Sequence, residues 1–94
     1  MKKYECMYIT DVQLAEDDKS KLAELIKSII KDNGGETLDV IDLGTRYLAY
    51  PVKKRNVGVY CLITFNGNAK VLSEVQQRLN YDDRLLKYMI TLVE

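Results

Sequence analysis

Residues 43–60 read "LGTRYLAYPVKKRNVGVY", and this stretch decides how the chain folds. Gly44 lies inside a run of strand-forming residues and indicates a bulge or a close backbone approach. Pro51 is the only proline of the chain. Because proline cannot donate to a ladder, it ends this strand or lies at the edge of a sheet. The stretch therefore predicts a strand over 36–50, a basic loop over 51–57 and a strand over 57–65.

The flanking sequence supplies four further elements. Residues 3–10 alternate and are rich in β-formers, which predicts a strand. The next segment is predicted to be a helix because five apolar residues share one stripe at helical spacing: Leu22, Leu25, Ile26, Ile29 and Ile30. Acidic residues suit its first turn, and the sequence "NGG" at 33–35 ends it. A shorter stripe predicts a second helix near 69–80, and 84–93 reads as a last strand.

The resulting order is β-α-β-β-α-β, with residues 1–94 expected to form a single domain. This order matches the ferredoxin-like α+β fold, a four-stranded antiparallel sheet with two helices on one face. Alternation along the strands predicts which side chains lie on the uncovered face: Met7, Ile9, Tyr60, Leu62, Leu85, Lys87 and Met89. Leu86 and Tyr88 are expected to point toward the helices. A patch this apolar indicates a binding partner, although large side chains can also simply stiffen an open sheet.

The chain is neutral overall, with 14 basic and 14 acidic residues, but its charges are unevenly distributed. Residues 11–42 carry a net charge of −5, and the remaining residues carry +5. Such a field can orient the molecule on a polyanion. No apolar run approaches the roughly 18 residues of a membrane helix, and the broken N-terminal pattern is unlike a signal peptide. We therefore expect a cytoplasmic protein with no membrane partner.

The sequence argues against enzymatic and metal chemistry. It contains no histidine, and its two cysteines, Cys6 and Cys61, are far apart. The acidic pairs at 17–18 and 82–83 are typical of helix caps and solvated turns. The glycines match neither a P-loop nor a dinucleotide-binding motif. We therefore expect no catalytic residues, no metal, no cofactor and no small-molecule substrate.

The basic residues point more usefully to nucleic acid. Lys53, Lys54 and Arg55 adjoin tyrosines in the predicted loop, and other bases lie at the starts of the first and last strands. They can neutralise phosphates, although charge alone does not distinguish this from a solvated loop. RNA-recognition motifs share this strand order but carry aromatics where this chain has Val57 and Val59. Contacts by loops and strand ends are therefore expected, without bases stacked across the sheet.

The segment "GTRYLAYPVKK" closely resembles the signature hairpin of the bacterial ribosomal protein numbered six in the small subunit. Gly44, Arg46, Pro51 and Lys54 fit the pattern of that family, as does the central "LAYP". Tyr4-Glu5 and the segment "YDDRLLKYMI" fit it as well, so that the resemblance spans residues 2 to about 93.

This resemblance implies a structural, non-enzymatic protein of the ribosome. It implies binding to the central domain of small-subunit ribosomal RNA, jointly with the small-subunit protein numbered eighteen, and support of subunit assembly. The expected RNA contacts are Lys2, Lys3, Tyr4, Arg46, Lys53, Lys54, Arg55, Arg84 and Lys87. The expected partner-protein surface is Met7, Ile9, Tyr47, Tyr60, Leu62 and Met89. The residues by themselves also allow a free-standing small-molecule regulatory module that dimerises through its uncovered sheet face.

Overall fold

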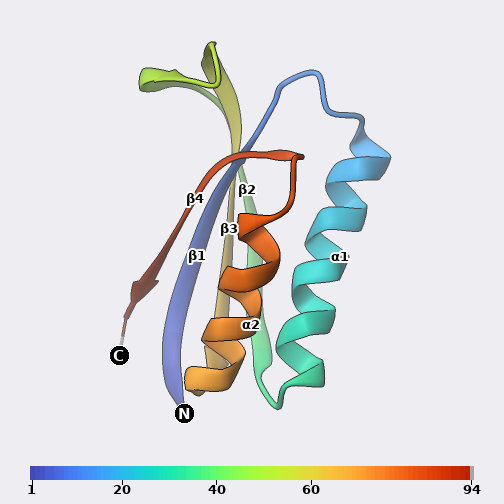
Figure 1. Ribbon diagram of the computed structural model, residues 1–94, viewed down its shortest axis with the longest axis vertical. Helices are drawn as coiled ribbons and strands as arrows, with labels where there is room; N and C mark the ends of the chain where they lie inside the picture. Colours follow the sequence, from blue (N-terminus) through green and yellow to red (C-terminus); the bar gives the residue numbers. More distant parts are fainter. Residues whose placement is uncertain (94) are drawn as a thin grey trace.

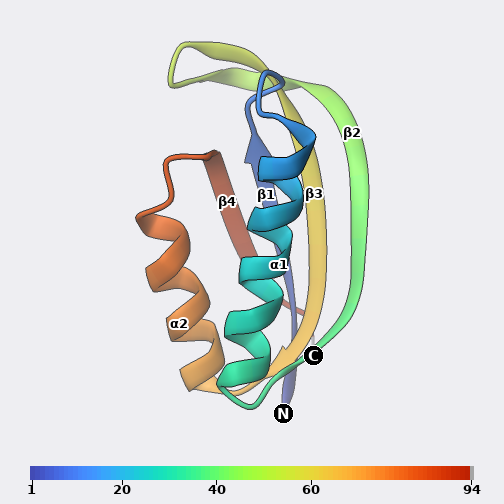
Figure 2. The ribbon, with the colours of Figure 1, turned by 90° about the vertical axis from the view of Figure 1, so that its right-hand side faces the viewer.

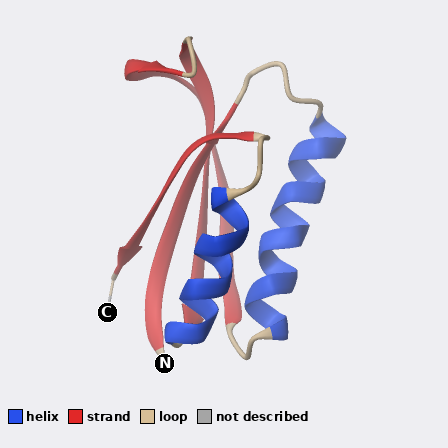
Figure 3. Cartoon of the chain, viewed as in Figure 1, coloured by secondary structure: helices blue, strands red, loops and turns tan. Residues whose placement is uncertain are grey.

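The computed structural model describes residues 1–93, and these form a sheet with two helices (Figures 1 and 3). The elements follow the predicted order: β1 (Lys2–Thr10), α1 (Glu16–Asp32), β2 (Glu36–Val52), β3 (Arg55–Gly67), α2 (Ala69–Asn80) and β4 (Leu85–Leu92). The strands lie in the order β2-β3-β1-β4, and every neighbouring pair is antiparallel. Both helices pack on the same side of the sheet (Figures 1 and 2). The predicted ferredoxin-like α+β fold is confirmed.

The core fills the space between the sheet and the two helices. Residues spaced four apart on α1 and on α2 project into it and are fully buried: Leu22, Ile26, Ile30, Val71 and Val75. From the sheet side, Ile63 and Phe65 are also fully buried. The Phe65 ring stacks on Tyr4 at 5.5 Å between centroids. Because side chains alternate along a strand, this burial of Ile63 and Phe65 agrees with the prediction that Tyr60 and Leu62 lie on the uncovered face.

Local sequence explains where the helices begin and end. The side chain of Asn68 caps α2 by accepting a hydrogen bond from the Val71 amide at 3.1 Å. Acidic residues occupy the first turn of α1, where they interact favourably with the helix dipole. After α1, Gly34 adopts a left-handed φ of 92°, and the Gly35 amide donates back to the Ile30 carbonyl. These contacts give the last carbonyl groups of the helix hydrogen-bond donors and direct the chain into β2.

The start of β4 differs from the prediction. Leu85 was expected on the uncovered face, but it is only 3% exposed and belongs to the core. The reason is an irregularity in the pairing of β1 with β4, where Ile9 lies opposite Lys87 but Thr10 lies opposite Leu85. This skipped position exchanges the faces of Leu85 and Leu86, because side chains alternate along a strand. Beyond the irregularity, the predicted alternation holds for Lys87.

The two strands of the β2–β3 hairpin extend into the loop predicted over 51–57, and the turn that joins them is shorter than predicted. Val52 still pairs with Arg55, so the turn consists of Lys53 and Lys54 alone. Both lysines have left-handed φ values, 50° and 67°, as a type I′ turn requires. The predicted bulge is present as well. At Gly44 the register with β3 shifts and φ is 84°.

Candidate RNA and partner interface

The sheet surface opposite the helices carries an ordered set of side chains. We call this surface the open face, since no helix of residues 1–93 covers it (Figure 1). Residues that pair across neighbouring strands project to the same side of a sheet. The register thus places one apolar residue from each strand in a single row across the open face, in the order Ile41, Leu62, Met7 and Met89. We call these four residues the apolar row.

Charged residues flank the apolar row with opposite signs. On the side toward the start of β1, the next row contains two acids, Asp39 and Glu5, together with Thr64 and Thr91. On the other side, the next row runs through Tyr60 and Ile9 to Lys87. Gly44 is the β2 residue of this row, and Arg46, two residues further along β2, lies opposite Gly58 in the row beyond it. The open face is therefore apolar at its centre, acidic on one flank and basic on the other.

The tip of the β2–β3 hairpin bends over the basic flank. In Figure 1 the tip, at the top, leans to the side of the sheet away from the helices. Lys87 donates a hydrogen bond to the Tyr50 hydroxyl, and its ammonium lies 4.9 Å from the centre of the Tyr50 ring. Lys53 donates to the Leu85 carbonyl at 3.0 Å. Both lysines therefore tie the hairpin to β4.

The hairpin covers Ile9 and makes it less accessible than its place on the open face would suggest. Ile9 lies on the open face as predicted, but it is only 7% exposed. It lines a small cavity of about 90 Å³ between the sheet and the hairpin, together with Leu48, Ala49, Tyr50, Val52, Tyr60 and Lys87. Ile9 thus packs between the sheet and the hairpin, and little of its side chain is accessible to a partner protein.

The residues expected to contact RNA fall into two groups at opposite ends of the sheet. Lys2 and Lys3 lie at the start of β1, which is the end marked N in Figure 1. The other basic residues gather around the hairpin and the start of β4: Arg46, Lys53, Lys54, Arg55, Arg84 and Lys87. Within the second group, Arg55 forms an ion pair with Asp11 at 2.8 Å, whereas the exposed Lys54 extends from the turn.

Two of the expected aromatic contacts are placed differently from the rest. Tyr4 is only 8% exposed, because its ring packs on Phe65 in the core. Tyr47 is 86% exposed, but it pairs with Val57 and therefore projects to the same side of the sheet as the helices. Neither ring lies on the open face.

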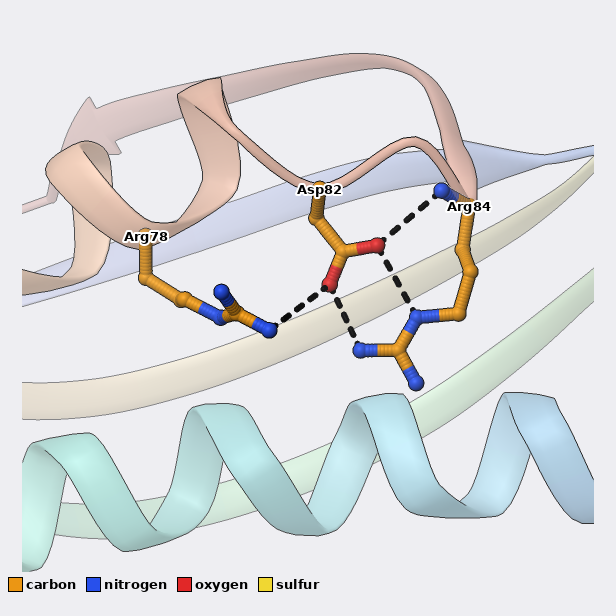
Figure 4. Close-up of polar contacts among 3 residues, drawn as sticks. All are labelled: Arg78, Asp82 and Arg84. Atoms are coloured by element: carbon orange, nitrogen blue, oxygen red, sulfur yellow. Dashed lines mark hydrogen bonds and ion pairs between the residues drawn. The ribbon is translucent and has the colours of Figure 1, made fainter.

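Arg84 has a partner within the protein that the sequence did not reveal (Figure 4). Its guanidinium donates to both carboxylate oxygens of Asp82, at 2.9 and 2.6 Å, and its backbone amide donates to Asp82 at 3.0 Å. The side chain of Asp82 is 3% exposed, and Arg78 approaches it at 3.9 Å. The hydrogen bonds from Arg84 hold the pKa of the Asp82 carboxyl below its usual range, and the same contact raises the pKa of Arg84. The sequence pattern indicated a solvated turn residue at Asp82, and only the base two positions later hinted at this contact.

Among the residues that the structure describes, the remaining reactive groups show no arrangement for catalysis. Burial raises the pKa of the Cys6 thiol to about 12, and burial also raises the pKa of Cys61, so both are protonated at neutral pH. Within residues 1–93, no three histidine, cysteine or acidic side chains come together as a metal site would require. No helix in this part of the chain is both long and apolar enough to cross a bilayer.

Comparison with known proteins gives a consistent result. The family model described as ribosomal protein S6 matches residues 3–91. The chain is 43% identical over 94 residues to the small ribosomal subunit protein bS6 of Dictyoglomus turgidum, and the match covers 100% of this chain and 97% of that protein. It is 36% identical over 89 residues to bS6 of Syntrophobacter fumaroxidans, where the match covers 95% of this chain but only 60% of the relative.

A solved structure supports the same conclusion about the fold. The crystal structure of 30S ribosomal protein S6 from Thermotoga maritima superimposes with a TM-score of 0.89 at 27% sequence identity, covering 97% of this chain and 86% of that one. The family match, the relatives and the superposition all extend over nearly the whole described chain. The chain therefore belongs to the ribosomal protein S6 family, whose members are structural proteins of the small ribosomal subunit and not enzymes.

Proposed function

We propose that this chain binds the central domain of small-subunit ribosomal RNA together with the small-subunit protein numbered eighteen, and that it supports assembly of the subunit in this way. The observation that carries the proposal is the open face. It combines an apolar row that no helix covers with a basic flank that continues into the basic hairpin. An apolar surface of this kind suits a protein partner, and the adjoining bases suit a phosphate backbone.

The distribution of charge explains why two binding partners are needed. The whole chain is neutral, and most of the bases around the hairpin already contact groups of the protein: Lys53, Arg55, Arg84 and Lys87. Few cations thus remain to release counterions from RNA, and we expect the isolated chain to bind RNA weakly. A basic partner protein docked on the open face would complete a shared RNA-binding surface.

RNA contact is expected to depend on phosphates and shape. Tyr60 is the one aromatic of β3 on the open face, and the hairpin tip covers its neighbour Ile9. β3 therefore does not present the pair of exposed rings on which an RNA-recognition motif stacks successive bases. Lys54, Arg46 and Lys2 are exposed and are the bases best placed for phosphate contacts.

A gel-shift experiment with a central-domain RNA fragment tests the proposal. We expect weak binding by this chain alone and tight binding after addition of the partner protein. Replacing Lys54→Gln together with Arg46→Gln should weaken the ternary complex and lower its salt slope by about one for each phosphate that is no longer neutralised. Lys31→Gln, at the exposed end of α1 on the helix side, is the matched control and should leave the complex unchanged. Tight RNA binding by the chain alone would contradict the proposal.

The alternative of a dimerising regulatory module can be tested on the same protein. Its support is that the apolar row could equally cover a second copy of itself. By sedimentation, the isolated chain should be a monomer. When small subunits are added at high magnesium concentration, it should co-migrate with them. A stable homodimer that does not associate with small subunits would instead favour the regulatory module.

A further inference from the structure

The open face contains a cavity beside the apolar row. It has a volume of about 170 Å³ and is lined by Met7, Ile9, Tyr60, Lys87, Tyr88 and Met89. An enclosed apolar cavity of roughly 150 Å³ holds a benzene ring, and this cavity, which is open to solvent on one side, has a similar volume. This cavity can therefore receive one large apolar side chain from outside the molecule.

The walls of the cavity suit such an occupant. Met7 and Met89 are unbranched and polarisable, so they adapt to the shape of an inserted group and make favourable sulfur–aromatic contacts. Met89 is 53% exposed and is free to move against an occupant. Lys87 contributes one donor to Tyr50. An ammonium has three donors, so two remain for an acceptor on the incoming chain.

The flanks of the cavity indicate the orientation of the occupant. Glu5 on β1 and Asp39 on β2 belong to the row with Thr64, which we call the acidic row. This row lies directly beside the apolar row that contains Met7. Lys87 lies on the opposite side of the cavity. Charge complementarity across an interface fixes register and excludes wrong orientations. A segment that enters the cavity thus fits with basic residues over Glu5 and Asp39 and with a carbonyl or carboxylate near Lys87.

We propose that this cavity is the anchor site for a single aromatic or large aliphatic side chain of a basic partner protein, and that the acidic row sets the direction in which the partner docks. This inference rests on the proposed function, because it names the occupant as the partner protein that completes the RNA-binding surface. Interfaces concentrate their binding free energy in a few buried anchors of this kind.

A titration without any partner tests whether the cavity accepts an aromatic group. The chain has three methionines, and only Met1 lies outside the apolar row and the cavity. With ¹³C-methyl-labelled methionine, added indole should shift the Met7 and Met89 signals and leave the Met1 signal in place. Equal shifts at all three methyls, or no shift at Met7 and Met89, would overturn the anchor site.

Calorimetry with the small-subunit protein numbered eighteen tests the occupant. Met7→Ala and Met89→Ala should each weaken binding about tenfold, and together about a hundredfold where the two losses add, as expected when an anchor loses its walls. Tyr81→Ala is the control, because Tyr81 is even more exposed than Met89, at 77% against 53%, but follows α2 on the helix side. Unfolding curves of each variant keep a loss of binding separate from a loss of folding.

The two proposals fail in different ways. If the unchanged chain binds the partner but both methionine variants bind as tightly as Tyr81→Ala, the anchor site is wrong and the proposed function stands. If the unchanged chain does not bind the partner at all, the proposed function is contradicted, and the occupant named here is contradicted with it.

Discussion

The two faces of the sheet are built from the same strands and the same alternation, yet they differ in what covers them. On the helix face, Cys6, Ile63 and Phe65 are fully buried. On the open face, their strand neighbours Met7 and Leu62 are only half-buried, and Met89 is 53% exposed. Apolar side chains on one face stabilise the fold, whereas those on the other face are available to a partner. Substitutions at two adjacent residues that point to opposite faces can therefore distinguish an effect on folding from an effect on binding.

The largest difference is expected between Ile63→Ala and Leu62→Ala. These residues are neighbours on β3 and point to opposite faces, and Ile63 is 0% exposed. Ile63→Ala leaves a cavity in the core and should lower the free energy of unfolding by about 2–5 kcal/mol. Leu62→Ala removes a half-covered side chain and should cost about 1 kcal/mol. Urea unfolding measures both changes.

In partner binding we expect the larger direct effect from Leu62→Ala, the substitution on the open face. Leu62→Ala should weaken partner binding even though its fold is nearly as stable as that of the unchanged chain. Equal losses of unfolding free energy for Ile63→Ala and Leu62→Ala would show that the open face is not the weaker contributor to stability. The comparison between the two faces would then fail.

The sequence was sufficient to predict the fold, since each strand is rich in β-forming residues between clear turn signals and each helix has a clear apolar stripe. It was insufficient at the start of β4, because the faces of Leu85 and Leu86 depend on how β1 and β4 are paired. It also missed the covering of Ile9, because the bend of the hairpin arises from tertiary contacts such as that between Tyr50 and Lys87. Periodicity reports local structure and contains no information about such contacts.

The candidate site shows the same division. The predicted alternation along the strands was enough to place Met7, Leu62 and Met89 on the open face, and the register in the structure brings them into one row. The sequence, however, offered only the closeness of Asp82 and Arg84 along the chain, which does not show that the two side chains are bound to each other. A charged residue in a loop has the same appearance in a sequence whether it faces solvent or a buried carboxylate. The structure was needed to separate exposed bases, such as Lys54, from those that already have partners.

The loop between α2 and β4 should show the next largest effect. Asp82→Asn removes the charge that accepts two hydrogen bonds from the Arg84 guanidinium, and it should lower the free energy of unfolding by about 1–3 kcal/mol at neutral pH. Asp83→Asn, at the exposed neighbouring position, is the matched control and should change it by less than about 0.5 kcal/mol.

The effect of Asp82 should also depend on pH. Its pKa in the folded protein lies below the value of about 3.9 for an unfolded aspartate. The ionised carboxylate therefore stabilises the fold fully above the unfolded pKa, and this contribution is lost as the pH falls through the folded pKa. The difference between Asp82→Asn and the unchanged chain should thus shrink in acid when unfolding is followed from pH 6 down to pH 3. A difference that stays constant over this range would show that the variant acts through packing and not through the charge.

The smallest effect is expected at the hairpin turn, which supports the covering of the open face. Lys54 has a φ of 67°, in the left-handed region that costs a non-glycine residue about 1–2 kcal/mol. Lys54→Gly removes this cost but increases the freedom of the unfolded chain, so a net gain of roughly 0.5–1 kcal/mol in unfolding free energy is expected. Lys54→Ala is the control, because alanine removes the same charge and keeps the strained backbone. If alanine stabilises the protein as much as glycine does, the turn is limited by repulsion among Lys53, Lys54 and Arg55, and relief of that repulsion by RNA phosphates becomes the better explanation for a basic hairpin tip.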